Sequence, residues 1–159
     1  MAIITLNNNS LSSVTALPAG VGGKVLQTVY AQSSTEITST SSTWTDALSL
    51  NITPSATSSK ILVLAACGGL TKSGGDTENQ LRVLRGATQI TETKGCNDGS
   101  GSSIQSQNGC AMNELDEPNT TSETTYKIQI RNRDSVGSVR VSNNNADTSL
   151  TLMEIAGWL

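Results

Sequence analysis

The stretch TTYKIQIRN, residues 124–132, decides the fold, because its side chains alternate strictly between apolar and polar. The apolar positions are Tyr126, Ile128 and Ile130, and the polar positions between them are Lys127, Gln129 and Arg131. Successive side chains of an extended strand point to opposite faces, so this period of two predicts a strand with one face in a core.

Similar patterns extend from this stretch in both directions, with turn residues between them. Leu48, Leu50 and Ile52 alternate, and the run ILVLAACGGL at 61–70 is typical of a strand buried on both faces, its outer face against another subunit. The other expected strands are 24–31, 80–86, 87–91, 110–117, 138–142 and 148–159. About eight strands at this spacing predict an all-β fold, a single antiparallel, jelly-roll-like β-sandwich over residues 24–159.

The final strand breaks the alternation. Leu150 and Leu152 share one face, whereas Met153 and Ile155 fall on the other, so either both faces are covered or a β-bulge shifts the phase. Glu154 interrupts the same apolar stretch, and we expect it at an edge or interface, paired with an arginine such as Arg82, Arg85 or Arg140.

The chain has two tryptophans, Trp44 and Trp158, and no phenylalanine. Aromatic side chains dominate core energetics, so each tryptophan either plugs an end of the sandwich or lies at a subunit contact. The candidates for an oligomer interface are therefore Trp44, Met153, Ile155 and Trp158.

Residues 1–23 differ from the rest. Their apolar side chains show no helical period, while Pro18 and several glycines break regular structure. We expect an extended N-terminal arm that is held by a neighbouring protein. Its candidate anchoring residues are Ile3, Ile4, Leu6, Leu11, Val14 and Leu17.

Charge and composition exclude several classes of function. The net charge is −3 and no basic cluster occurs, so nucleic-acid binding lacks its electrostatic basis. No apolar run approaches the roughly 20 residues of a membrane span, and the N-terminus lacks the pattern of a secretory signal. We therefore expect synthesis in a cytoplasm and no membrane or nucleic-acid partner.

The chain contains no histidine, which removes Ser-His-Asp and Cys-His catalysis and histidine metal ligands. The acidic cluster of Glu114, Asp116 and Glu117 precedes Pro118, and we expect a solvated turn there, with a Ca²⁺ site as the alternative. The expectation is a protein that is not an enzyme and has no cofactor.

The three cysteines are an odd number, which argues against a disulfide framework in a protein made in a cytoplasm. Cys67 lies in an apolar run and is expected as a small buried hydrophobe. Cys96 and Cys110 bracket a Gly/Ser/Asn-rich loop, and whether they pair stays open.

Three stretches carry a resemblance to a known group of proteins: ITPSATSSKILVL at 52–64, LDEPNTTSETTYKIQ at 115–129 and TLMEIAGW at 151–158. Together with neighbouring sequence they make residues 23–159 similar to structural proteins of marine and cyanobacterial tailed-phage virions. The N-terminal segment is similar to those of virion-attached phage proteins. The resemblance implies a virion role and supplies no catalytic residues. We expect the protein on the outer surface of the particle.

Two functions fit this resemblance. The first is a trimeric capsid cement or decoration protein, or short head fibre, whose arm inserts into grooves of the major capsid protein or another virion protein. The alternative is a tail-fibre or receptor-binding protein that recognises a host surface glycan through loops 72–79 and 95–109. These loops contain no tyrosine or tryptophan, which counts against the alternative.

Overall fold

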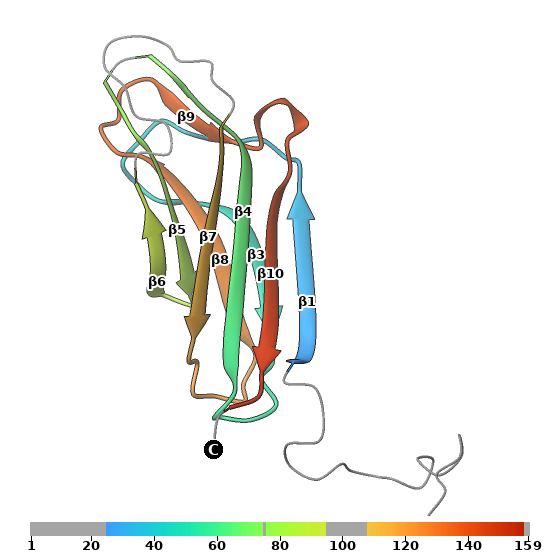
Figure 1. The fold of residues 1–159 in the computed structure, drawn as a ribbon. Coiled ribbons are helices and arrows are strands. Elements are labelled where there is room, and N and C mark those ends of the chain that lie inside the picture. Colours follow the sequence, from blue (N-terminus) through green and yellow to red (C-terminus); the bar gives the residue numbers. More distant parts are fainter. Residues whose placement is uncertain (1–24, 75, 95–107, 158–159) are drawn as a thin grey trace, which may run out of the picture.

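The computed structural model describes residues 25–74, 76–94 and 108–157, and within them it shows two antiparallel sheets packed face to face (Figure 1). The predicted all-β sandwich is therefore confirmed. The expected arm, with its candidate anchoring residues, lies outside the described residues, as do Trp158 and most of the loop at 95–109.

The two sheets have six and four strands. The first runs β1 (Val25–Ser33), β10 (Thr148–Ile155), β4 (Lys60–Ser73), β9 (Ser138–Val141) and β2 (Ile37–Ser39), with β7 (Asn108–Asp116) also paired to β4. The second runs β3 (Thr45–Ile52), β8 (Thr124–Asn132), β5 (Asn79–Arg85) and β6 (Thr88–Thr93).

The connectivity is that of a jelly roll. Without the short strands β2 and β9, the strand orders are β1-β10-β4-β7 and β3-β8-β5-β6. When the eight remaining strands are counted along the chain, one sheet contains the first, eighth, third and sixth. The other contains the second, seventh, fourth and fifth, and this arrangement is the jelly-roll order. In Figure 1, β1, β10, β4 and β7 form one layer and β3, β8, β5 and β6 the other.

The core lies between the layers and is built from the predicted alternation. Tyr126, Ile128 and Ile130 of β8 are fully buried, as are Leu150 and Leu152 of β10. Burying one such side chain contributes about 1.5–3 kcal/mol. The apolar side of the stretch at 124–132 therefore faces the middle of the core.

The strand expected to be buried on both faces, 61–70, is covered on one face only. Ile61 and Val63 of β4 point into the core and are fully buried, whereas Leu64 on the other face is 37% exposed. Within the described chain the four-stranded sheet covers only the inner face, and the covering of the outer face by another subunit stays a prediction. The apolar residues of the outer face remain in contact with solvent.

The broken alternation in β10 has a simple cause. β10 pairs with β4 in continuous register from Thr148 opposite Cys67 to Ile155 opposite Lys60, so no bulge shifts the phase. Leu152 is buried inside, while Met153 and Ile155 lie on the outer face and are half-buried. β10 is thus apolar on both faces at its C-terminal end.

The expectation for Glu154 was wrong, because this carboxylate is fully buried at the end of the sandwich and meets no arginine. It accepts hydrogen bonds from the backbone nitrogen of Ser55 at 2.7 Å and from Ser55 Oγ, Ser59 Oγ and Gln27 Nε2, each at 2.6 Å. Burial alone would raise the pKa of Glu154, but the hydrogen bonds from Ser55, Ser59 and Gln27 outweigh burial and lower it to about 2.

This carboxylate should make stability depend on pH. Because its pKa is lower in the folded than in the unfolded chain, its contribution is present above pH 4.5 and is lost as the pH falls toward 2. Glu154→Gln should cost on the order of 2–3 kcal/mol at pH 7, and the difference from the unsubstituted protein should shrink between pH 4.5 and 2. Urea unfolding across this range measures it, with exposed Glu114→Gln as control. A difference independent of pH would contradict the assignment.

The acidic cluster is divided between core and solvent. Asp116 is only 8% exposed and accepts two hydrogen bonds from Arg85 Nη1, at 2.6 and 2.7 Å, and one from the Tyr126 hydroxyl at 2.6 Å. The expectation of a solvated turn was therefore wrong for Asp116, although Glu117 is exposed and pairs with Lys60. Among the described residues, no group of three or more Asp, Glu or Cys side chains is placed to hold a metal ion.

Candidate functional site

The outer faces of the two sheets differ sharply in character. The outer face of the four-stranded sheet is covered by charged and amide side chains. That of the six-stranded sheet has few charges and carries a group of apolar side chains. We call the second surface the apolar face. It consists of Tyr30 on β1, Met153 and Ile155 on β10, Leu62 and Leu64 on β4, and Leu115 on β7.

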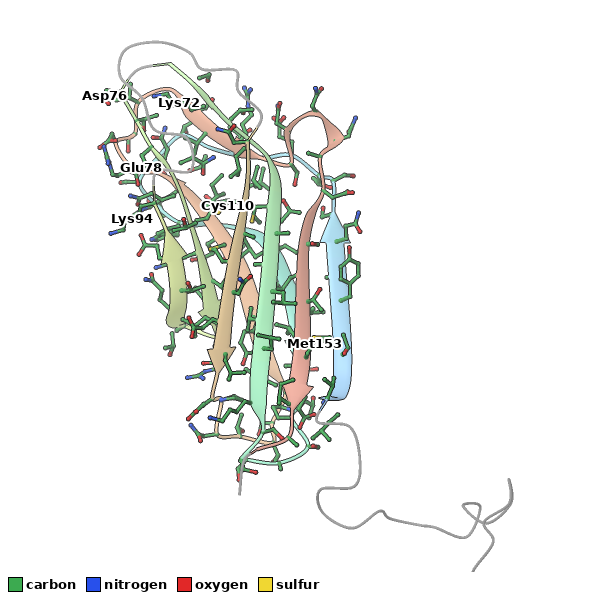
Figure 2. The ribbon with its side chains drawn as sticks, viewed as in Figure 1. Lys72, Asp76, Glu78, Lys94, Cys110 and Met153 are labelled. Carbon is green, nitrogen blue, oxygen red and sulfur yellow. The ribbon has the colours of Figure 1, made fainter. Side chains whose placement is uncertain are left out.

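Strand register brings the apolar residues of neighbouring strands together. Thr28, Met153, Leu62 and Leu115 lie opposite one another in successive strands and so form a row across the sheet. Leu64 belongs to the neighbouring row on the same face, where Thr151 separates it from Tyr30 and Asn113 lies on its other side. Side chains directly opposite in antiparallel strands lie about 4.5–5.5 Å apart at Cβ, which is contact distance. Figure 2 shows Met153 on β10, in the layer that β10 forms with β1 and β4.

The apolar face is exposed. Tyr30 is 57% exposed and Leu115 44%, and Val25 and Leu26 at the start of β1 are also exposed. Four strands about 4.8 Å apart and about eight residues long give the whole outer sheet surface roughly 500 Å². The apolar side chains share this surface with Thr28, Thr151 and Asn113. The largest apolar patch on a typical soluble monomer covers a few hundred Å² and often carries a function, so the apolar part of this surface is a candidate site.

Charge is almost absent from this surface. Of the described side chains that point outward from β1, β10, β4 and β7, only that of Lys60 is charged, and it pairs with Glu117 at the end of the sheet. Glu114 of β7 lies opposite Val63 and therefore belongs to the other side of the strand. A partner would displace water here without stripping charges of their hydration.

The opposite outer face, which we call the polar face, contains Trp44. The guanidinium carbons of Arg82 and Arg131 lie 4.2 and 4.4 Å from the centroid of its ring. Hydrogen bonds from Lys127 at 2.8 Å and Gln129 at 2.5 Å lower the pKa of Asp46 on the same face. These side chains bond to one another, as expected for a solvated sheet surface.

Only part of the predicted interface is brought together. Met153 and Ile155 lie side by side on the apolar face, whereas Trp44 lies half-buried on the polar face. The sequence analysis missed the contributions of Tyr30 and Leu115, because placing them requires the order of β1 and β7 in the sheet. The continuous run at 61–70 was the signal for Leu62 and Leu64.

The described part of the loop predicted to bind a glycan offers little surface. Lys72, Thr77 and Glu78 are buried, and the Lys72 ammonium donates a hydrogen bond to the carbonyl of Thr77 at 3.1 Å. The structure describes no helix long and apolar enough to cross a membrane in residues 25–74, 76–94 and 108–157.

No protein-family model and no curated protein sequence matches the chain. Solved structures resemble it distantly. The VP2 subviral particle of infectious bursal disease virus is 15% identical over 82% of this chain and 37% of its own, with a TM-score of 0.38. The insecticidal delta-endotoxin Cry8Ea1 of Bacillus thuringiensis is 16% identical over 76% of this chain and 20% of its own, with a TM-score of 0.42.

The Gt strain of infectious bursal disease virus is 13% identical over 84% of this chain and 39% of its own, with a TM-score of 0.42. The chain thus spans less than half the length of each of these proteins. The similarity concerns the β-sandwich fold, and no function follows from it.

Proposed function

We propose that the protein is a structural protein of a tailed-phage virion, a capsid cement or decoration protein or short head fibre. The observation that carries the proposal is the apolar face, a broad uncharged surface suited to permanent contact with protein. The resemblance of residues 23–159 to virion structural proteins supplies the assembly in which that contact is made.

The proposed occupant of the apolar face is a second copy of this chain, in a homotrimer. Side chains near a symmetry axis meet the same side chains of the other copies. A charged residue there would therefore be repelled by its symmetry-related copies. The apolar face meets this requirement, because Leu64, Met153 and Leu62 are uncharged and Lys60 lies at its end. The polar face, with Arg82, Arg131 and Lys127, would bring like charges together.

The N-terminal arm is proposed to bind the capsid. The apolar face lies within a sheet surface of roughly 500 Å², which is smaller than the roughly 800 Å² that each partner contributes to a stable interface, so further contacts are needed. Residues 1–23 precede β1 and, fully extended, would span up to about 75 Å. Their apolar side chains would occupy grooves between capsid subunits, and three arms per trimer would add their affinities.

Deleting residues 2–22 should abolish incorporation into phage heads while leaving the sandwich folded. The deletion removes no described contact of the core, so the thermal unfolding midpoint, Tm, should stay within a few degrees. Binding to heads that lack the protein can be followed by sedimentation. The matched control keeps the arm and replaces Asn7, Asn8 and Asn9 with serine. Full occupancy by the truncated protein would contradict anchoring by the arm.

Stoichiometry separates decoration from the alternative, a receptor-binding protein of the tail. The observation that favours the alternative is Trp44 on the polar face, since an aromatic ring among amide and charged side chains suits a glycan. Quantitative mass spectrometry of purified particles gives the ratio to the major capsid protein. A decoration protein should be present at a ratio comparable to one copy per copy of the major capsid protein. A ratio far below one would favour the receptor-binding protein of the tail.

A further inference from the structure

Two of the three cysteines lie directly opposite each other in the six-stranded sheet. Cys67 of β4 and Cys110 of β7 are register partners, next to the pair Ala66 and Ala111. Directly opposed residues of antiparallel strands have Cβ atoms about 4.5–5.5 Å apart. A disulfide spans about 3.5–4.5 Å between Cβ atoms, so a small approach of the strands would bring the pair within bonding geometry.

Both side chains point to the inner side of the sheet. Cys67 is 2% exposed in the core, and Cys110 is half-buried and packs against the same core cluster. The β4–β7 register shifts immediately beyond them, between Cys67 and Leu70, so the pair lies where the ladder can adjust. Figure 2 shows Cys110 in the part of β7 that runs beside β4.

The position suits a cross-link. Among the described strands, β7 pairs only with β4, so it is an edge strand, and Cys110 is its third residue. Edge strands open more readily than central ones, since one side has no ladder. A bond between Cys67 and Cys110 would tie the start of β7 to the central strand of the sheet.

We propose that Cys67 and Cys110 form a disulfide when the protein leaves a reducing cytoplasm. The biological setting rests on the proposed virion function, because particles released by lysis enter an oxidising medium. The oxidant is a small-molecule disulfide or an equivalent two-electron acceptor. The Cys110 thiolate, the more exposed, attacks one sulfur of that disulfide and expels a thiolate; the Cys67 thiolate then attacks the mixed disulfide and expels the second.

The bonds balance in this exchange. One S–S bond of the oxidant is broken and one forms between Cys67 and Cys110. Two protons leave the cysteines, and two electrons reduce the oxidant to two small thiols. The product closes the chain between residues 67 and 110, which restricts the unfolded state and should raise stability.

Treating the purified full-length protein with oxidised glutathione tests the bond directly. Non-reducing peptide mapping should find Cys67 joined to Cys110, and the Tm should rise by about 10 °C relative to protein kept in reductant. Cys96→Ser should keep both effects, whereas Cys67→Ala and Cys110→Ser should remove both.

Persistence of both thiols after oxidation would overturn the proposal, and so would a bond between Cys96 and Cys110, the pairing that the sequence left open. The experiment uses no phage particles. Its failure therefore refutes the disulfide alone, while failure of the full-length protein to bind heads refutes the head-decoration role alone.

Discussion

Replacing Leu64 with lysine is expected to dissociate the proposed homotrimer into single chains. Leu64 is in the middle of the apolar face, between Thr151 of β10 and Asn113 of β7, and it is 37% exposed in the single chain. Near a threefold axis the substitution would bring three ammonium groups together and strip them of water. A cost of about 3 kcal/mol at this contact corresponds to a dissociation constant raised by about 100-fold.

Sedimentation velocity over a range of concentrations measures this shift. Leu64 points away from the core, so the substituted chain should remain folded, with an unchanged circular dichroism spectrum. Gln129→Lys, which adds the same charge to the polar face, is the matched control and should leave association intact. If the two variants associate equally, the apolar face is not the contact surface.

Asp116→Ala should cause a large loss of stability for a single substitution at a charged position. It would leave the buried Tyr126 hydroxyl and the Arg85 guanidinium without their shared acceptor. Burial and the Asp116 carboxylate raise the pKa of Tyr126, so its hydroxyl stays protonated and needs that acceptor. The expected cost is about 3 kcal/mol, or a fall in Tm of about 10 °C.

The neighbouring residue provides the control for this prediction. Glu117 is exposed and its ion pair with Lys60 is at the surface, so Glu117→Ala should cost less than about 1 kcal/mol. Urea unfolding of both variants at pH 7 measures the difference. Equal losses would mean that Asp116 contributes no more than a solvated charge, as its sequence context first indicated.

The fold was largely predictable because its strands carry local signals. The alternation at 124–132 identified β8 and its buried face, and the expected strands 80–86 and 87–91 correspond to β5 and β6. β2, at Ile37–Ser39, was missed because three residues in a Ser/Thr-rich segment are too short to show a period. Its pairing with β9, far along the chain, is what makes it a strand.

The buried charges could not be predicted, because their partners are distant in sequence. Asp116 meets Arg85, and Glu154 meets Ser55, which is 99 residues away. The sequence shows only that a charge stands near apolar residues. Whether that charge meets solvent, an arginine or a set of hydroxyl groups depends on how the ends of the sandwich close.

The candidate site was predictable only where one strand carried the signal by itself. Met153 and Ile155 were identified because both faces of a single strand are apolar. Tyr30 and Leu115 join them through the strand order β1-β10-β4-β7, which connects segments from opposite parts of the chain. Jelly-roll topology, and not any local motif, assembles the apolar face.

The native mass of the unsubstituted full-length protein tests the central claim most directly. Sedimentation equilibrium should give the mass of three chains, because the apolar face would be covered by other copies of the chain. A mass of two chains would keep the apolar face as the contact but overturn the threefold arrangement. A mass of one chain at micromolar concentrations would contradict the claim that this face assembles the protein.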